Sequence, residues 1–257
     1  MSLVREIKEK NKLWELMKKD PCAYLYLIGD LDPFYFPKTR WFTIKGLPSV
    51  FLLYQAEKHS ILITPKIQDS STLSEILSEL SFVLPERFYL DSPARPKADR
   101  NFTIGFSHPH QRMLLQNPSL KRRNPSLLIQ SLNHSHSQQL LDFYTLSYPD
   151  HWYDSFMIET GKFKAIIKDD QILSVAGIHT YSPDYKTAAL GNIATHPLHR
   201  NQGYGYEVIT ALCLELMNEC QWIGLNVLSK NKKAIDLYHQ IGFKDQFTFY
   251  ESEITKK

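Results

Sequence analysis

The sequence predicts a mixed α/β protein made of two successive domains. Short strand-like apolar runs alternate with helical patterns, which is typical of sheets covered by helices. The order helix, three strands, helix, strand occurs in the first half and returns in the second. Between the halves, residues 91–125 are rich in prolines, as loops at a domain junction are. We therefore expect an N-terminal domain over residues 1–124 and a second domain over residues 125–257.

The composition is that of a soluble globular chain of 257 residues, 43% hydrophobic and 22% charged. A net charge of +3 does not favour a nucleic-acid partner, and Lys121-Arg122-Arg123 is interpreted as a solvated linker. No apolar run reaches the length of a membrane span, and no signal peptide is visible. Three cysteines without a disulfide pattern point to a reducing compartment. We expect a cytoplasmic protein, for which a homodimer is compatible with the sequence.

The first half opens with an amphipathic helix over residues 4–19, which Asp20-Pro21 ends because proline cannot continue a helix. A second apolar segment, residues 23–31, is also predicted to be helical. The pattern of residues 70–80 predicts a capped helix with one apolar face. The predicted strands of this half cover residues 41–45, 49–55, 60–64, 87–90 and, among loops, 113–116, with turns at Pro48 and Glu57-Lys58.

The second half contains a predicted β-hairpin, whose strands are residues 162–168 and 171–181. Asp169-Asp170 joins them, and aspartate is a residue type that tolerates tight turns. Gly161 closes the helix that precedes the hairpin. The remaining predicted strands cover residues 126–131, 188–195, 223–228 and 247–252, and the helices cover residues 136–147, 150–160, 205–220 and 231–241.

The loop Arg200-Asn201-Gln202-Gly203-Tyr204-Gly205 leads from a strand directly into a helix. A helix start offers backbone N–H groups without partners and the positive end of the helix dipole, so it favours an anion. Gly203 and Gly205 allow the backbone to turn tightly and to approach a pyrophosphate, and Arg200 adds a cation. The spacing differs from that of a dinucleotide-binding loop and from that of a P-loop.

Two blocks of the sequence resemble the GNAT superfamily of acetyl-CoA-dependent N-acyltransferases. Arg200 to Gly205 fits the family's Arg/Gln-x-x-Gly-x-Gly/Ala, and Ala194 to Pro197 stands where the preceding strand ends in Val-x-Pro. Asn231 to Phe243 fits Asn-x-x-Ala-x-x-x-Tyr-x-x-x-Gly-Phe. The resemblance spans residues 126–257, and residues 161–243 are especially similar to the two-domain, glycine-N-acyltransferase-like branch.

The resemblance implies a GNAT-like fold that uses acetyl-CoA as co-substrate, without a metal, to acetylate an amine of a small molecule or amino acid by direct attack. It implies that Tyr238 protonates the leaving thiolate and that a strand amide near Ile193 or Ala194 stabilises the oxyanion. The implied cofactor contacts are the backbone of Ile193, Ala194 and Thr195 for the pantetheine arm, Arg200, Asn201, Gln202, Gly203, Tyr204, Gly205 and Tyr206 for the pyrophosphate, and Asn231 at the next helix.

One departure from the family concerns the general base. Many relatives carry a glutamate on the middle strands, whereas residues 188–195 contain no ionisable side chain, so His179, His196 and an ordered water all stay open. The departure leaves alternatives: a non-catalytic acyl-CoA-binding sensor or interaction module, or a peptide or protein N-acetyltransferase.

The first half contains no Arg-x-x-Gly-x-Gly between its third strand and the following helix. Because its order of elements echoes the second half, we interpret it as a degenerate GNAT-like copy that has lost cofactor binding and helps to shape the acceptor site. His108-Pro109-His110 and His134-Ser135-His136 have no cysteine or carboxylate cluster at ligand spacing, so no metal site is predicted.

Overall fold

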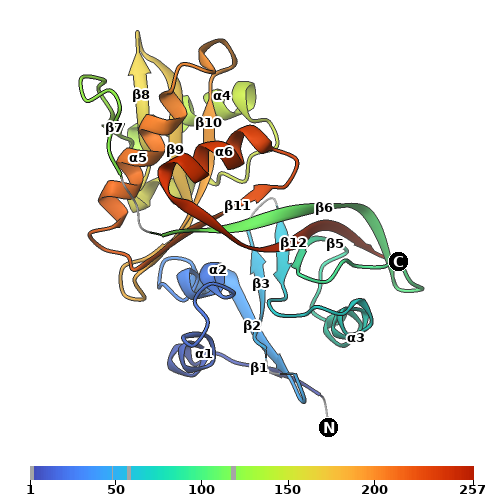
Figure 1. Cartoon of the computed structure of the whole chain (residues 1–257). Coiled ribbons are helices and arrows are strands. Elements are labelled where there is room, and N and C mark those ends of the chain that lie inside the picture. The colour runs from blue at the N-terminus through green and yellow to red at the C-terminus, as the bar shows by residue number, and fades with distance from the viewer. Residues whose placement is uncertain (1–2, 48, 57–58, 117–119) are drawn as a thin grey trace. The chain divides into compact units, whose positions relative to one another are not determined.

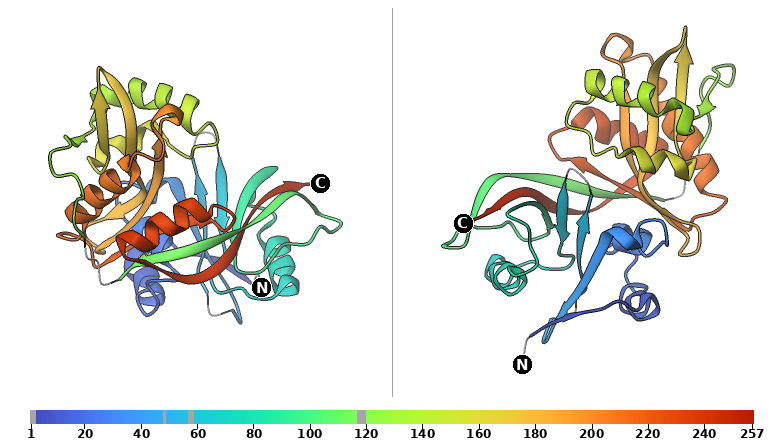
Figure 2. Two further views of the ribbon diagram at one scale, coloured as in Figure 1. Left: turned by 45° about the horizontal axis from the view of Figure 1, so that its top comes forward. Right: turned by 180° about the vertical axis from the view of Figure 1, so that it is seen from behind.

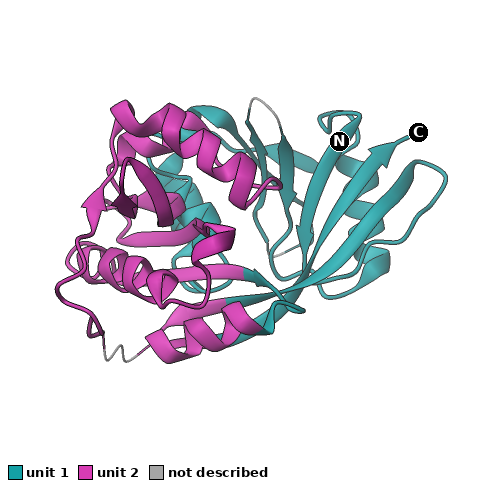
Figure 3. Ribbon diagram, turned by 90° about the horizontal axis from the view of Figure 1, so that it is seen from above, with its two compact units in different colours: residues 1–112, 227–232, 245–257 teal, residues 113–226, 233–244 magenta. Residues whose placement is uncertain are grey.

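The computed structural model describes residues 3–47, 49–56, 59–116 and 120–257. Its contacts divide the chain into two compact units, which Figure 3 colours separately. Pro48, Glu57-Lys58 and Pro118, which the sequence assigns to turns and loops, lie outside the described residues. Unit 1 comprises residues 1–112, 227–232 and 245–257, and unit 2 comprises residues 113–226 and 233–244.

The units interleave along the chain. The chain first passes from unit 1 to unit 2 after residue 112, whereas the sequence places the domain boundary after residue 124, and the last strand returns to unit 1. Within the described ranges, no helix has both the length and the apolar character needed to cross a membrane.

Unit 1 is a sheet with the strand order β1-β2-β3-β4-β5-β12-β6 (Figure 1). β4 and β5 pair in parallel, whereas the pairs β1–β2, β2–β3, β3–β4 and β5–β12 are antiparallel. The elements are β1 (Val4–Glu6), α1 (Lys10–Met17), α2 (Leu25–Gly29), the 3-10 helix η1 (Phe36–Lys38), β2 (Thr39–Ile44), β3 (Phe51–Gln55), β4 (Ser60–Ile63), α3 (Ser70–Leu80), β5 (Arg87–Ser92), β6 (Phe102–Leu115) and β12 (Phe243–Lys256).

Helix α3 forms where the sequence predicts it. The side chain of Asp69 accepts a hydrogen bond of 2.7 Å from the backbone N–H of Thr72, which caps the first turn. The apolar residues of its one face are buried in a core that also contains Phe51, Leu62 and Phe88 of the sheet. Capping and burial of one face therefore both fix this helix against the strands.

Unit 2 is a sheet with the strand order β11-β10-β9-β8-β7, in which β10 and β11 are parallel and the other pairs are antiparallel. Helices α4 and α5 lie on opposite faces of this sheet (Figures 1 and 2). The elements are β7 (Gln130–Ser131), the 3-10 helices η2 (His134–His136), η3 (Ser155–Thr160) and η4 (Pro197–His199), α4 (Ser137–Ser147), β8 (Lys164–Lys168), β9 (Gln171–Ser182), β10 (Thr187–Thr195), α5 (Tyr204–Leu216), β11 (Trp222–Leu228) and α6 (Lys232–Ile241).

The two units share an order of elements. Each contains three strands joined antiparallel, then a helix, then a strand that is parallel to the third: β2-β3-β4-α3-β5 in unit 1 and β8-β9-β10-α5-β11 in unit 2. The predicted hairpin between β8 and β9 is confirmed. Asp169 and Asp170 both have positive φ, of 49° and 57°, as a tight two-residue hairpin turn requires.

Five predictions from the sequence were wrong in extent. Residues 4–6 form strand β1 beside β2, so the first helix begins only at Lys10. Residues 102–112, predicted as loops, belong to the long strand β6, whose hydrogen-bonded neighbours in the sheet are distant in sequence. Residues 150–160 contain only the short η3, and the strand over 126–131 is reduced to β7. Helix α5 ends at Leu216, so Cys220 lies beyond it; both it and Cys213 are buried free thiols.

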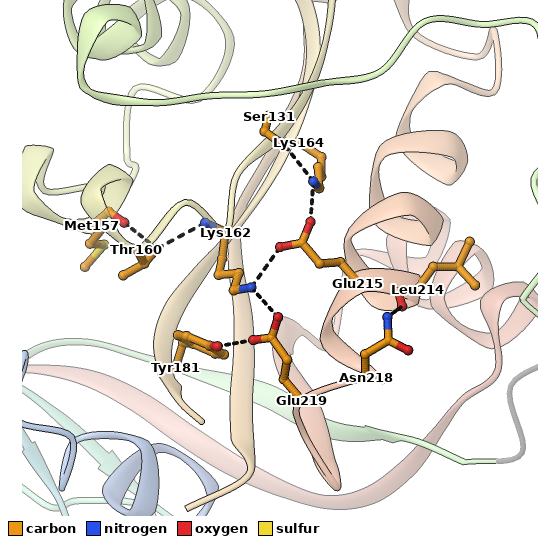
Figure 4. Close-up of polar contacts among 10 residues, drawn as sticks. All are labelled: Ser131, Met157, Thr160, Lys162, Lys164, Tyr181, Leu214, Glu215, Asn218 and Glu219. Carbon is orange, nitrogen blue, oxygen red and sulfur yellow. Dashed lines mark hydrogen bonds and ion pairs between the residues drawn. The ribbon is translucent and has the colours of Figure 1, made fainter. Parts of the chain in front are cut away.

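An ion-pair network ties the C-terminal half of α5 to the sheet of unit 2 (Figure 4). The ammonium of Lys162 lies 2.8 Å from a carboxylate oxygen of Glu215 and 2.8 Å from one of Glu219. Tyr181 donates a hydrogen bond to Glu219, and Lys164 pairs with Glu215. Since carboxylates at the C-terminal end of a helix oppose its dipole, the two lysines offset an arrangement that would otherwise be unfavourable.

We predict that Lys162→Met lowers the free energy of unfolding by about 2 kcal/mol, because it leaves two partly buried carboxylates without their common cation. The loss stays below that of a fully buried pair because the Glu215 and Glu219 side chains are 30% and 35% exposed. Urea denaturation measures it, and Lys168→Met, at an exposed lysine at the end of β8, is the matched control.

The difference between Lys162→Met and the wild type should shrink in acid. The hydrogen bond from Lys162 holds the pKa of Glu219 below its usual value. A carboxyl whose pKa is lowered by folding contributes stability above its unfolded pKa, and that contribution disappears as the pH falls through the folded pKa. A stability difference that stays constant from pH 7 down to ~3 would contradict the ion-pair explanation.

Candidate functional site

Strands β10 and β11 separate part of the way along their length. Their parallel register runs from Thr187 opposite Trp222 to Leu190 opposite Leu225. Beyond Leu190, β10 continues to Thr195 without a further β11 partner in that register. The backbone of residues 191–195 therefore presents one edge that β11 does not pair, and an extended molecule can add to such an edge as a strand would.

A β-bulge in β10 lies at this separation. The register with β9 shifts between Gly191 and Ala194, and Asn192 has a φ of 53°, which is left-handed backbone. The bulge is held from both sides. The hydroxyl of Tyr144 on α4 donates to the carbonyl of Asn192 at 2.6 Å, and the side-chain amide of Asn192 donates to the carbonyl of Ile178 at 3.0 Å. This bulge redirects the backbone groups that follow it.

The residues Ile193, Ala194 and Thr195 are half-exposed. The carbonyl of Ala194 accepts from the Ser174 hydroxyl at 3.2 Å, and that of Thr195 accepts from the Arg200 side chain at 3.2 Å. Both hydrogen bonds come from side chains, and they fix the direction of the strand end. Because a carbonyl oxygen has two lone pairs, the carbonyls of Ala194 and Thr195 can each accept a further hydrogen bond.

The loop from residue 200 to 205 begins α5 without a side-chain cap. Gly203, at the N-cap position, has a φ of 81°, and Asn201 before it has a φ of 63°. The first backbone hydrogen bond of the helix runs from the N–H of Glu207 to the carbonyl of Gly203, at 3.2 Å. The N–H groups of Tyr204, Gly205 and Tyr206 precede it and lie at the positive end of the helix dipole. Asn201, Gln202 and Gly203 are exposed, so an anion can reach this helix start.

Arg200 contributes to the loop in a way the sequence did not suggest. Its guanidinium donates to the carbonyl of Thr195 at 3.2 Å and to that of Ser147, at the end of α4, at 3.3 Å. The side chain therefore ties the loop to the end of β10 and to α4. The positive charge of Arg200 can still attract an anion at the helix start, because Coulomb attraction does not require a hydrogen bond between the two groups.

Helix α6 packs beside the start of α5. A Cβ added at Gly205 would lie 3.5 Å from the Leu237 side chain and 3.6 Å from the Thr195 hydroxyl, so the first turn of α5 lies close to both. The next residue on α6, Tyr238, is 8% exposed, and its ring lies edge-on to Phe243 at 5.8 Å. Burial raises the pKa of Tyr238 well above its usual value, so its hydroxyl keeps its proton at neutral pH.

Asn231 is the one candidate residue outside unit 2. It belongs to the segment 227–232 that contact clustering assigns to unit 1, and it directly precedes the start of α6 at Lys232. The other eleven candidates, on β10, the loop, α5 and α6, all belong to unit 2.

The segment Lys121-Arg122-Arg123 is not a solvated linker, and that interpretation was wrong. Arg122 pairs with the buried carboxylate of Glu207 in the first turn of α5, at 3.1 Å, and the backbone N–H of Arg123 donates to the same carboxylate at 2.9 Å. The guanidinium of Arg123 lies 3.8 Å from the centre of the Tyr206 ring. Sequence reasoning missed this contact because the partners are more than eighty positions apart.

Of the two histidines proposed as bases, His179 lies at the bulge. A Cβ added at Gly191 would lie 2.0 Å from the His179 ring, so glycine is required there. Burial lowers the pKa of His179 to about 4, and its imidazole is therefore neutral at neutral pH. His196 instead accepts a hydrogen bond from the N–H of Leu198 and caps η4. Among the described residues there is no group of three or more His, Cys, Asp or Glu side chains arranged to hold a metal ion.

Comparison with known proteins finds one family whose model resembles part of this chain. Residues 129–243 match the model of the acetyltransferase (GNAT) family, a segment that contains the separated strands, the loop and α6. A search of curated proteins finds no match to the chain.

Solved structures share the fold at low sequence identity. A Drosophila protein matches with a TM-score of 0.72 and 13% identity, covering 100% of this chain and 99% of its own. A GCN5-related N-acetyltransferase from Kribbella flavida matches with a TM-score of 0.61 and 14% identity, and the match covers 91% of this chain and 95% of the Kribbella chain. A GNAT-family protein from Novosphingobium aromaticivorans matches with a TM-score of 0.63 and 15% identity, covering 80% and 88%.

The predicted fold class, a mixed α/β sheet of the GNAT type, is confirmed by these structures over the whole chain. The strand separation, the bulge and the uncapped helix start all lie inside the matched segment. Residues 129–243, which contain these features, are thus similar to the acetyltransferase (GNAT) family.

Proposed function

We propose that the protein transfers the acetyl group of acetyl-CoA to an amine of a small molecule or amino acid. The observation that carries this proposal is the position of the uncapped start of α5 beside the free edge of β10, within the family-matched segment. The two-unit organisation and the shared order of elements favour the glycine-N-acyltransferase-like branch and a degenerate copy in unit 1. The cytoplasm stays our prediction for its compartment.

The proposed cofactor site divides into two parts. The amides of residues 201–206, together with the charge of Arg200, would hold the pyrophosphate by charge-assisted hydrogen bonds. The backbone of Ile193, Ala194 and Thr195 would pair with the amides of the pantetheine arm as an added strand. Asn231 would contact the cofactor from the start of α6. The half-exposed residues of the strand end and the exposed residues of the loop support this assignment.

The proposed chemistry is direct attack on the thioester. The amine nitrogen forms a bond to the acetyl carbon, the C–S bond breaks, and Tyr238 gives its proton to the leaving thiolate. Because the raised pKa of Tyr238 keeps its phenol protonated, the proton is present to be donated. The same burial makes the transfer cost more than it would for an exposed tyrosine, whose pKa of ~10 lies close to that of a thiol. A backbone N–H of Ile193 or Ala194 would stabilise the oxyanion. The excess proton of the amine passes to water, because a pKa of about 4 makes the His179 imidazole too weak a base to accept it near neutral pH.

A second candidate function is a non-catalytic acyl-CoA-binding sensor. It is favoured by the absence of an ionisable side chain on β10, all of whose residues are described. Incubation with acetyl-CoA and a panel of amines, amino acids and peptides, with free thiol release as the readout, separates the two functions. Acetyl-CoA binding without thiol release for any acceptor would favour the sensor, and thiol release with a peptide alone would assign a peptide acceptor.

We predict that Gly203→Ala weakens acetyl-CoA binding at least tenfold, or ~1.4 kcal/mol. At φ 81° an alanine is strained by ~1–2 kcal/mol, and relief of that strain rotates the amides at the helix start away from the anion. Isothermal titration calorimetry measures the dissociation constant.

Gly161→Ala is the matched control for this variant. Gly161 also lies in unit 2 at a positive φ of 69°, and, like Gly203, an added Cβ there would meet nothing within 4 Å. It introduces the same kind of backbone strain away from the loop. Equal loss of binding in both variants would show that strain in general, rather than the helix start, controls affinity.

We predict that Tyr238→Phe lowers turnover about a hundredfold while the dissociation constant of acetyl-CoA changes by less than about twofold. The substitution removes the proton donor and keeps the buried ring that packs against Phe243. Steady-state thiol release and calorimetry give the two quantities. Tyr181→Phe, which removes a hydroxyl from Glu219 at the far end of α5, should leave both unchanged. Full turnover by Tyr238→Phe near neutral pH would refute the acid role.

A further inference from the structure

Two carboxylates face each other across the sheet of unit 1. The antiparallel register of β5 and β12 places Asp91 directly opposite Glu251. Side chains at such paired positions lie on the same face, and like charges there are destabilising. Asp91 is only 7% exposed, and its Oδ1 atom has no hydrogen-bond partner among the described residues. A buried carboxylate oxygen without a donor is costly, so this position calls for an explanation.

One cation compensates part of this charge. Arg112 on β6 is 4% exposed and interacts electrostatically with Asp91. Its guanidinium donates to the carbonyl of Cys22 at 3.1 Å and lies 4.7 Å from the centre of the Tyr26 ring. Burial, and then the charge of Glu251, raise the pKa of Asp91 well above its usual value, so this pair tends to retain a proton. When both carboxyls are ionised, their two negative charges and the positive charge of Arg112 leave a net charge of −1, which a cation in place of the proton would balance. The pair is therefore suited to one further positive charge.

Aromatic rings continue from the carboxylates along the same side. Tyr89 precedes Asp91 by two positions on β5, and side chains two apart on a strand share a face. Its ring lies 6.1 Å from that of Phe106 on β6, which in turn stacks on His108 at 5.1 Å. Tyr89 and Phe106 are half-exposed. Aromatic faces next to a net negative charge attract organic cations, since the ring quadrupole adds to the charge.

A metal ion fits this site poorly. Within the described ranges, no three His, Cys, Asp or Glu side chains are arranged to hold one. Hard divalent cations also require six or more oxygen ligands, which a pair of carboxylates does not supply.

We propose that Asp91 and Glu251 form a binding site in unit 1 for a monovalent organic ammonium ion whose apolar body rests on Tyr89 and Phe106. The site involves only residues of unit 1 and stands independently of the proposed acetyl transfer. The ammonium supplies the hydrogen-bond donors that Asp91 Oδ1 lacks and the positive charge that Arg112 leaves unmatched.

Binding should strengthen with pH. Burial raises the pKa of Glu251 to about 7. The titratable and charged side chains that interact with the pair include Arg112 and His108 on β6. Tyr26 of α2 and the thiol of Cys22 interact with Arg112. Since the ligand stays charged up to pH ~10, affinity should rise about tenfold between pH 6 and pH 8 as Glu251 ionises.

The test is calorimetric titration of the full chain, without acetyl-CoA, with 2-phenylethylamine and with its uncharged analogue 2-phenylethanol. We expect the amine to bind at least tenfold more tightly than the alcohol at pH 8. Asp91→Asn and Glu251→Gln, which keep the shape of each side chain, should each weaken amine binding at least tenfold. Glu79→Gln is the matched control, because Glu79 is exposed on α3, which packs on the opposite face of β5 with Phe88 and Leu90, and it should leave binding within about twofold.

Two results would overturn the proposal: equal affinity for the amine and the alcohol, or undiminished amine binding by Asp91→Asn and Glu251→Gln. Melting temperatures of the variants show whether they fold, and the comparison of the two ligands on the wild type needs no variant. Because this titration contains no acetyl-CoA, a failure of the amine to bind says nothing against the proposed transferase activity. Loss of acetyl-CoA binding in the separate titration likewise leaves this site unaffected.

Discussion

The register of β10 against its two neighbours is the constraint on which the candidate site depends. Pairing with β11 stops at Leu190, and the shift against β9 between Gly191 and Ala194 turns the backbone of residues 193–195 toward the unpaired edge. Tyr144 and Ile178 fix that shift through Asn192. Without the bulge, the backbone N–H and C=O groups of this edge would point in other directions. The helix start next to Thr195 would then have no strand edge beside it that could bind the same ligand.

The two units show how one order of elements supports different chemistry. In both, the third strand leads into a helix followed by a parallel strand. At the start of α3 the carboxylate of Asp69 accepts from the backbone and occupies the position of an anion. Hydrogen bonds from the Ser71 hydroxyl and from the backbone N–H of Thr72 hold the pKa of Asp69 well below its usual value. At the start of α5, Gly203 has no side chain to do so. A single capping residue therefore distinguishes a closed helix start from one open to phosphate.

Sequence patterns predicted the features whose causes are local. The turn at Asp169-Asp170, the capped helix α3 and the loop before α5 depend on residues within a few positions of one another. Features that depend on distant partners were not predictable. Strand β6 contains Pro109 and two histidines, and only its place in the sheet makes it a strand. The contact of Arg122 with Glu207 and the opposition of Asp91 and Glu251 arise from strand register and tertiary packing, which no local pattern encodes.

Backbone hydrogen exchange with and without acetyl-CoA tests the central claim most directly, because the proposed ligands are backbone amides. The account predicts that acetyl-CoA slows exchange in two segments of unit 2, residues 193–195 and 201–206, and leaves the first turn of α3 in unit 1 unchanged. Exchange that is unaltered in both segments at saturating acetyl-CoA would contradict the account, as would protection confined to α3.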